Sequence, residues 1–147
     1  MKTQSLPLLI ELATGERDRA ASRYAHTVQQ AQQIDRQLGT LSGYAGDYAR
    51  RGHQRRLVGI DAAANLNQSA FVGRIDQVLE QQKAELERVR ALAETERQAM
   101  LALEMKLKSL ETLATRQAET LRLAQARREQ KLMDEMAMQV LQRREPD

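Results

Sequence analysis

The chain has 147 residues and a net charge of +3, from 23 Lys and Arg residues against 20 Asp and Glu residues. It contains no Cys and no Trp, and only one Phe and three Tyr, so it lacks the large side chains that fill the core of an ordinary compact domain. The absence of cysteine excludes disulfides and a thiolate nucleophile, and it fits a reducing compartment. The apolar run at residues 6–10 is stopped by Glu11 and is too short for a signal peptide or a membrane span. These features predict a cytoplasmic protein without direct membrane insertion.

The first expected element is a helix over about residues 5–49. The only prolines are Pro7, near its start, and Pro146, at the end of the chain, so neither interrupts a long helix. Alternating steps of three and four residues from Ile10 meet twelve positions, of which ten are apolar or aromatic. This 3.5-residue period predicts a seam along which two helices supercoil. The positions are Ile10, Ala13, Arg17, Ala20, Tyr24, Thr27, Ala31, Ile34, Leu38, Leu41, Ala45 and Tyr48.

A basic, glycine-rich loop is expected at about residues 50–60. Four glycines, at positions 43, 46, 52 and 59, gather around it, and each lowers helix propensity by up to about 1 kcal/mol relative to Ala. Asp61 is a suitable N-cap for a second helix because its carboxylate can accept unpaired backbone N–H groups.

The loop also concentrates positive charge. Arg50, Arg51, Arg55 and Arg56 face only Asp47 between positions 46 and 60, an excess equal to that of the whole chain. A solvated hairpin tip is the favoured interpretation, and contact with phosphate or anionic lipid is the alternative.

The second expected element is a helix over about residues 61–143. Steps of three and four from Leu79 meet fourteen positions, of which eleven are apolar, and Ile75 and Val72 extend the series backward. Beyond Ala124 the series meets Arg128 and Lys131, so we expect the seam to loosen there. The fourteen positions are Leu79, Gln82, Leu86, Val89, Ala93, Glu96, Met100, Leu103, Leu107, Leu110, Ala114, Gln117, Leu121 and Ala124.

The predicted fold is all-α: a single domain, residues 1–147, forming an elongated antiparallel two-helix coiled-coil hairpin with a long C-terminal overhang. Pairing centred near position 55 would place Leu41 opposite Ser69 and Ile10 opposite Met100, and would leave the second helix without a partner beyond about Leu107. Apolar residues continue past that point, and an exposed apolar stripe normally marks an interface. The overhang is therefore expected to bind another protein. The alternatives are that the N-terminal residues fold back over it or that the chain dimerises.

No catalytic, cofactor or metal site is predicted. His26 and His53, the only histidines, have no neighbouring ligands in metal-binding spacing, and no phosphate-binding loop motif is present. Four arginines and one Phe do not form the continuous basic and aromatic surface that nucleic acids need. We therefore expect neither an enzyme nor a nucleic-acid-binding protein.

Phe71 is the only Phe, and together with Ile75 and Val78 it forms an apolar patch at helical spacing near the loop. As core, this patch would pack on Leu38 and Leu41. As an interface, it would offer an i, i+4, i+7 set of anchors to a partner.

Four groups of residues, taken in order, resemble the FliJ family of the bacterial flagellar type III export apparatus. They are Leu9-x-x-Leu12-Ala13 with Glu16 and Asp18, Tyr44-x-x-x-Tyr48, Asn67-x-x-x-Phe71-x-x-x-Ile75, and Gln130-Lys131-x-Met133-Asp134-Glu135. The resemblance covers nearly the whole chain and rests on the order and distances of these groups, since none is specific alone.

The resemblance implies a central stalk that couples the hexameric export ATPase, FliI, to the export-gate protein, FlhA, with export chaperones as further partners, in flagellum assembly and motility. It places the protein at the cytoplasmic face of the inner membrane. Injectisome stalk proteins and a self-associating structural coiled coil are the alternatives. The residues that the resemblance assigns to the gate are Phe71, Ile75, Val78 and Gln82, and those that it assigns to the ATPase are Leu121, Gln130, Lys131, Met133, Asp134 and Glu135.

Overall fold

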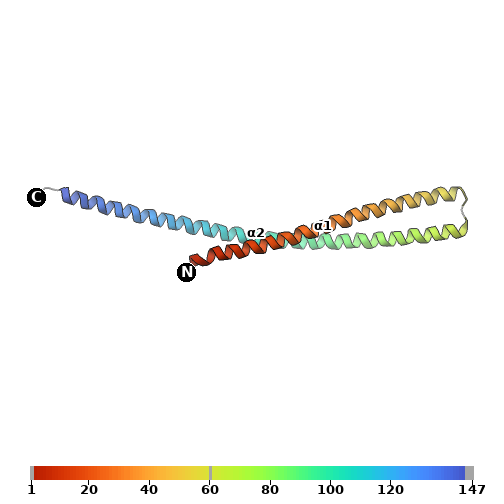
Figure 1. Cartoon of the computed structure of the whole chain (residues 1–147), viewed down its shortest axis with the longest axis horizontal. Coiled ribbons are helices and arrows are strands. Elements are labelled where there is room, and N and C mark those ends of the chain that lie inside the picture. The colour runs from red at the N-terminus through yellow and green to blue at the C-terminus, as the bar shows by residue number, and fades with distance from the viewer. Residues whose placement is uncertain (1, 60, 145–147) are drawn as a thin grey trace. The chain divides into compact units, whose positions relative to one another are not determined.

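The computed structural model describes residues 2–59 and 61–144, with the side chains of residues 2–4 left out. Two helices account for nearly all of them: α1, Lys2–Leu57, with 56 residues, and α2, Ala62–Arg144, with 83 residues. They pack against each other and run in opposite directions from one turn, with no strand in the described ranges (Figure 1). The predicted all-α helical hairpin is confirmed.

The turn between the helices is shorter than predicted. Residues 50–57, expected in the loop, continue α1, and only residues 58–61 separate the helices. Gly59 has a φ of 89°, in the left-handed region that favours glycine, and its N–H donates to the Arg56 carbonyl at 3.3 Å. Gly59, two residues after the last residue of α1, thus terminates the helix, as glycine commonly does. The glycines at 43, 46 and 52 lie inside α1.

Gly52 shows why the helix continues through the glycine-rich segment. A Cβ at this position would overlap the side-chain amide of Gln68, so the absence of a side chain lets α1 and α2 approach closely here. Gln68 is buried at this contact. Packing against α2 therefore offsets the low helix propensity that suggested a loop.

The described chain divides into two units, and the one next to the turn comprises residues 18–59 and 61–102. Its least exposed side chains follow the predicted steps of three and four on both helices. Ala20, Leu86 and Val89 are the most deeply buried apolar members, and Arg90 and Asp35 form an ion pair across the helices at 3.9 Å. The predicted heptad seam is therefore present in this unit.

The other unit comprises residues 2–17 and 103–144, in which the start of α1 packs on the middle of α2. Ala13 and Leu107 are buried, and Lys106 pairs with Glu16 across the helices at 3.7 Å. Leu6 and Ile10 line a groove with Ala114 and residues up to Leu121. The seam thus continues along both helices of this unit.

The pairing register differs from the prediction. The ring of Tyr48 packs on that of Phe71, with a centroid distance of 4.6 Å, whereas a turn centred at position 55 would have put position 62 opposite Tyr48. Ile10 likewise lies against Ala114 and not against Met100. Because the turn lies further along the chain than expected, every partner on α2 is displaced toward its C-terminus.

The displaced register also moves the start of the overhang. Seam residues of α2 are shielded as far as Gln117, ten positions beyond the predicted limit at Leu107, which is itself buried. Every residue from 118 to 144 is exposed. The overhang is present but shorter than predicted, because α1 begins at Lys2 and reaches further along α2.

Candidate partner-binding surfaces

Phe71 and Val78 lie on one flank of the hairpin, just outside the seam. They are seven residues apart and have similar exposures, 41% and 42%. Leu92, two heptads beyond Val78, is also 42% exposed and occupies the same heptad position. We call Phe71 and Val78 the flank pair.

The other two residues assigned to the gate, Ile75 and Gln82, fall on seam positions and are only partly exposed. They face α1 together with Val72 and Leu79, so the four residues divide into two seam members and two flank members. Phe71 itself packs on Tyr48, at an interplanar angle of 53°. It is thus partly an internal contact and partly exposed surface.

The second surface lies on α2 after the seam ends. Between residues 132 and 141 six apolar side chains occupy two adjacent rows, each with a spacing of four residues, so they cover one side of the helix. We call this set the C-terminal apolar face. Its five large members are 50% to 66% exposed. The rows are Leu132, Met136 and Val140, and Met133, Ala137 and Leu141.

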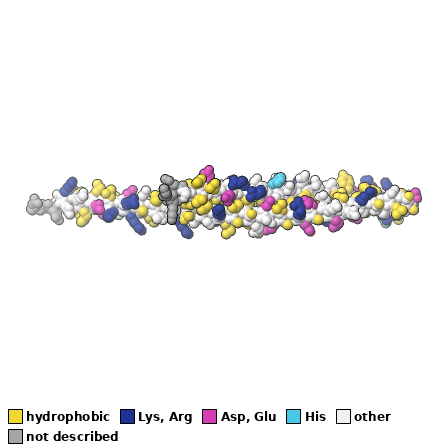
Figure 2. All heavy atoms as spheres, turned by 90° about the horizontal axis from the view of Figure 1, so that it is seen from below, with side chains coloured by type: hydrophobic (Ala, Val, Ile, Leu, Met, Phe, Trp, Pro, Cys, Tyr) yellow, Lys and Arg dark blue, Asp and Glu magenta, His cyan; other side chains and the backbone are white. Residues whose placement is uncertain are grey.

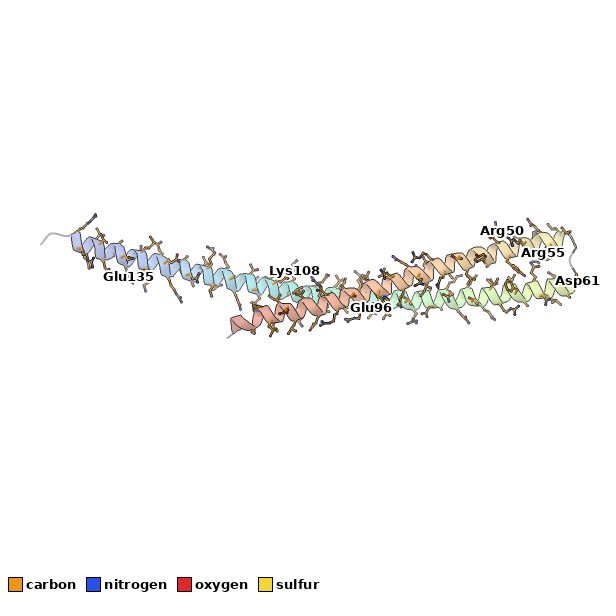
Figure 3. All side chains as sticks on the ribbon, viewed as in Figure 1. Arg50, Arg55, Asp61, Glu96, Lys108 and Glu135 are labelled. Carbon is orange, nitrogen blue, oxygen red and sulfur yellow. The ribbon has the colours of Figure 1, made fainter. Side chains whose placement is uncertain are left out.

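Polar side chains occupy the other side of this segment. Lys131, Asp134, Glu135 and Met138 line one shallow groove there with Gln139 and Gln142. The Gln130 amide donates to the Asp134 carboxylate at 3.1 Å. Figure 2 shows yellow apolar side chains beside blue and magenta charged ones near the C-terminal end of the described chain, and Figure 3 shows Glu135 on α2 there.

The structure therefore separates the residues assigned to the ATPase. Met133 belongs to the C-terminal apolar face, whereas Lys131, Asp134 and Glu135 lie on the polar side. Leu121 is 58% exposed and lies in the groove beside Leu6, Pro7 and Ile10. Ala137 and Leu141 were not predicted for this surface, although they follow Met133 by four and eight residues and so lie on the same side of the helix.

Exposed Glu and Arg pairs, three residues apart, line α2. Glu85 binds Arg88, Glu94 binds Arg97 and Glu119 binds Arg122, at 2.6 to 3.0 Å. Hydrogen bonds from Arg97, and then from Gln98, lower the pKa of Glu94 to about 2. These three carboxylates are held charged by their neighbours on the same helix, as is typical of a solvated helix face.

Within the described residues no group of three or more His, Asp or Glu side chains could hold a metal ion. No helix in the same ranges has a stretch long and apolar enough to cross a membrane. The described surface thus consists of a helical seam, apolar patches beside it and charged flanks.

Two antiparallel helices joined by one turn, with a heptad seam between them and an uncovered apolar face at one end, define a coiled-coil hairpin. The chain matches the family model described as the flagellar FliJ protein over residues 1–146. It therefore belongs to the FliJ family, a non-enzymatic component of flagellar protein export. No curated protein and no solved structure matched the chain in the corresponding searches.

Proposed function

We propose that this FliJ family member is the central stalk that couples a hexameric export ATPase to the export gate, at the cytoplasmic face of the inner membrane. The C-terminal apolar face binds the ATPase and the flank pair binds the gate protein, while export chaperones are further partners. The observation that carries the proposal is that the six side chains of the C-terminal apolar face remain uncovered beyond the end of the seam at Gln117.

The composition of the C-terminal apolar face suits a protein partner. Three of the chain's six methionines lie between residues 133 and 138, and Met133 and Met136 are on this face, 66% and 59% exposed. Methionine is unbranched and polarizable, so it adapts to irregular surfaces. An amphipathic helix with apolar residues on one side fits a hydrophobic groove or another helix.

The flank pair offers a smaller surface. An exposed aromatic ring is a frequent anchor in protein interfaces, and the Tyr48 ring holds Phe71 from one side, so little conformational entropy remains to be lost on binding. Val78 enlarges the apolar area on the same flank. Ile75 and Gln82 support this surface from the seam.

The test of the ATPase surface compares two methionines of nearly equal exposure. Met136 is on the apolar face, and Met138, 60% exposed, lies two residues on and about 200° around the helix, on the polar side. Met136→Ser is expected to weaken binding to the hexameric export ATPase by at least about tenfold, and Met138→Ser by much less. Calorimetric titration measures both. Equal affinities for the two variants would contradict the assignment.

The gate surface is tested with Val78→Ser and the matched Leu92→Ser, which have equal exposure and the same heptad position. We expect only Val78→Ser to weaken binding to the cytoplasmic domain of the gate protein, while circular dichroism shows similar helicity for both. A loss with Leu92→Ser of the same size would indicate a general effect on the hairpin.

Sedimentation over a range of concentrations separates the proposed stalk from a structural coiled coil, because a stable dimer without partners would favour self-association.

A further inference from the structure

The turn end of the hairpin combines exposed apolar and basic side chains. Leu57, Val58 and Leu66 are 76%, 87% and 72% exposed, which places them among the four most exposed large apolar residues in the described ranges. Leu57 and Val58 are adjacent where α1 ends, and Leu66 is in the second turn of α2. We call these three residues, with Arg51, Arg55 and Arg56, the hairpin tip.

The hairpin tip lies in the part of the chain that holds the whole net charge. Residues 43–75 contain five arginines against two aspartates, whereas the rest of the chain has 18 basic and 18 acidic residues. Arg50 pairs with Asp47, but Arg51, Arg55 and Arg56 form no ion pair with any described residue. Figure 3 shows Arg50 and Arg55 near the end of α1, and Asp61, the other acidic residue, at the start of α2.

The three arginines lie on different sides of α1. Gly52 faces α2, and at 100° per residue Arg51 and Arg55 lie on one side of that direction and Arg56 on the other. A groove on a partner protein would contact basic groups on one side only. A charged plane that meets the hairpin end-on would contact the arginines on both sides and the apolar residues between them.

We propose that the hairpin tip binds the surface of an anionic lipid bilayer. The guanidinium groups contact lipid phosphates, and Leu57 and Val58 enter the boundary between headgroups and acyl chains. Arginine suits this position because its planar fork donates to phosphate oxygens while its stem covers apolar surface. Peripheral contact of this kind needs basic charge and apolar area together, and the tip supplies both. Of the two interpretations of the arginine cluster, the exposed apolar pair favours lipid contact over a merely solvated tip.

Co-sedimentation of the full chain with vesicles tests the proposal. We expect binding to phosphatidylcholine vesicles that contain phosphatidylglycerol, weak binding to phosphatidylcholine alone, and weaker binding as salt rises. Replacing Arg51, Arg55 and Arg56 with Gln should lower the partition coefficient by about a hundredfold, from about fivefold per arginine. The matched control replaces Arg116, Arg127 and Arg128, which removes the same charge elsewhere, and should lower it less than about fivefold.

A tryptophan reporter tests the apolar part, because the chain has no Trp. Val58→Trp should shift its fluorescence to shorter wavelength with anionic vesicles, whereas Met105→Trp, at an exposed position of α2, should not. Leu57→Ser with Val58→Ser should weaken vesicle binding about tenfold. Both side chains are highly exposed, so these changes should leave the helical content unchanged.

Three results would overturn the proposal: no preference for anionic vesicles at low salt, equal losses in the tip and control arginine variants, or equal fluorescence shifts for the two tryptophans. A chain that ignores vesicles but loses gate-protein binding when the tip arginines are replaced would show that the tip binds protein. None of these results bears on the ATPase surface, which the methionine comparison tests separately.

Discussion

Individual polar residues in the seam differ in how well they are accommodated. Thr27 is buried, and its hydroxyl donates to the Arg23 carbonyl of its own helix at 3.1 Å. Glu96, also a seam residue, has a buried carboxylate oxygen with no hydrogen-bond partner among the described residues. Thr27 satisfies its hydroxyl locally, as threonine often does in helices, whereas Glu96 faces the partner helix at a cost.

We predict that Glu96→Leu stabilises the hairpin. The substitution removes an unsatisfied buried oxygen and adds apolar area to the seam, so the free energy of unfolding should rise by about 1 kcal/mol. Urea unfolding followed by circular dichroism measures the change. Glu94→Leu, two residues away and exposed, loses the bond to Arg97 instead and should bring no gain; a gain from both variants would mean that seam burial is not the cause.

The glycines give a second prediction at the residue scale. Gly46 is inside α1 with open space where a Cβ would be, so Gly46→Ala should raise the free energy of unfolding by up to about 1 kcal/mol. Gly59 has positive φ, so Gly59→Ala should lower it by about 1 to 2 kcal/mol. Thermal melting of the two variants should shift in opposite directions, and two shifts of the same sign would refute this account.

At the scale of the helices, the leucines of the seam and those of the C-terminal apolar face lie in opposite environments. Leu107 is 4% exposed and Leu132 is 58% exposed on the same helix. We predict that Leu107→Ala costs about 2 to 4 kcal/mol of stability, whereas Leu132→Ala costs less than about 0.5 kcal/mol. Urea titrations of both variants check this. A similar cost for both would mean that residue 132 is covered in solution, for example by a second copy of the chain.

Helix periodicity was predictable from the sequence, but the C-terminal end of α1 was not. The seam positions on both helices follow a 3.5-residue apolar pattern, and any antiparallel pairing of the two helices must bury the residues of that pattern. The turn was misplaced because four glycines have similar propensities in isolation. Only the structure shows that Gly52 packs on Gln68 while Gly59 has the left-handed conformation. The exposed C-terminal stripe was predicted from the sequence pattern. The side of α2 that it covers could be assigned only once the structure showed where the seam ends.

The candidate surfaces were predicted less completely. Phe71 was identified because it is the only Phe, and its exposure of 41% agrees with neither full burial nor full exposure. The contact between Phe71 and Tyr48 was not predicted, because it depends on the pairing register of the two helices, and the register depends on where the turn lies. The arginine cluster was predictable from the sequence, but the exposed apolar pair Leu57 and Val58 beside it was not, because their exposure follows from the position of the turn.

At the scale of the whole molecule, the binding surfaces that we propose lie on different segments of the chain and can be tested separately. We predict that truncation after residue 124 leaves the melting temperature of the hairpin nearly unchanged, since residues 118–144 are all exposed. The same truncation should abolish ATPase binding while vesicle binding through the hairpin tip persists. Melting curves and the two binding assays test this together, and a truncated chain that still binds the ATPase would refute the assignment of the C-terminal apolar face.

No side chain in the described residues is fully buried, because each helix has only one neighbour to cover its seam. Such a structure has no single core whose loss unfolds everything at once. Its stability is distributed in small increments along one dimension, as in repeat proteins, where each layer interacts only with the next. Leu86 and Leu107 are about six helical turns apart on α2, so the losses from Leu86→Ala and Leu107→Ala should add in the double variant. A chain built in this way can release one segment to a partner while the segments further along the seam stay folded.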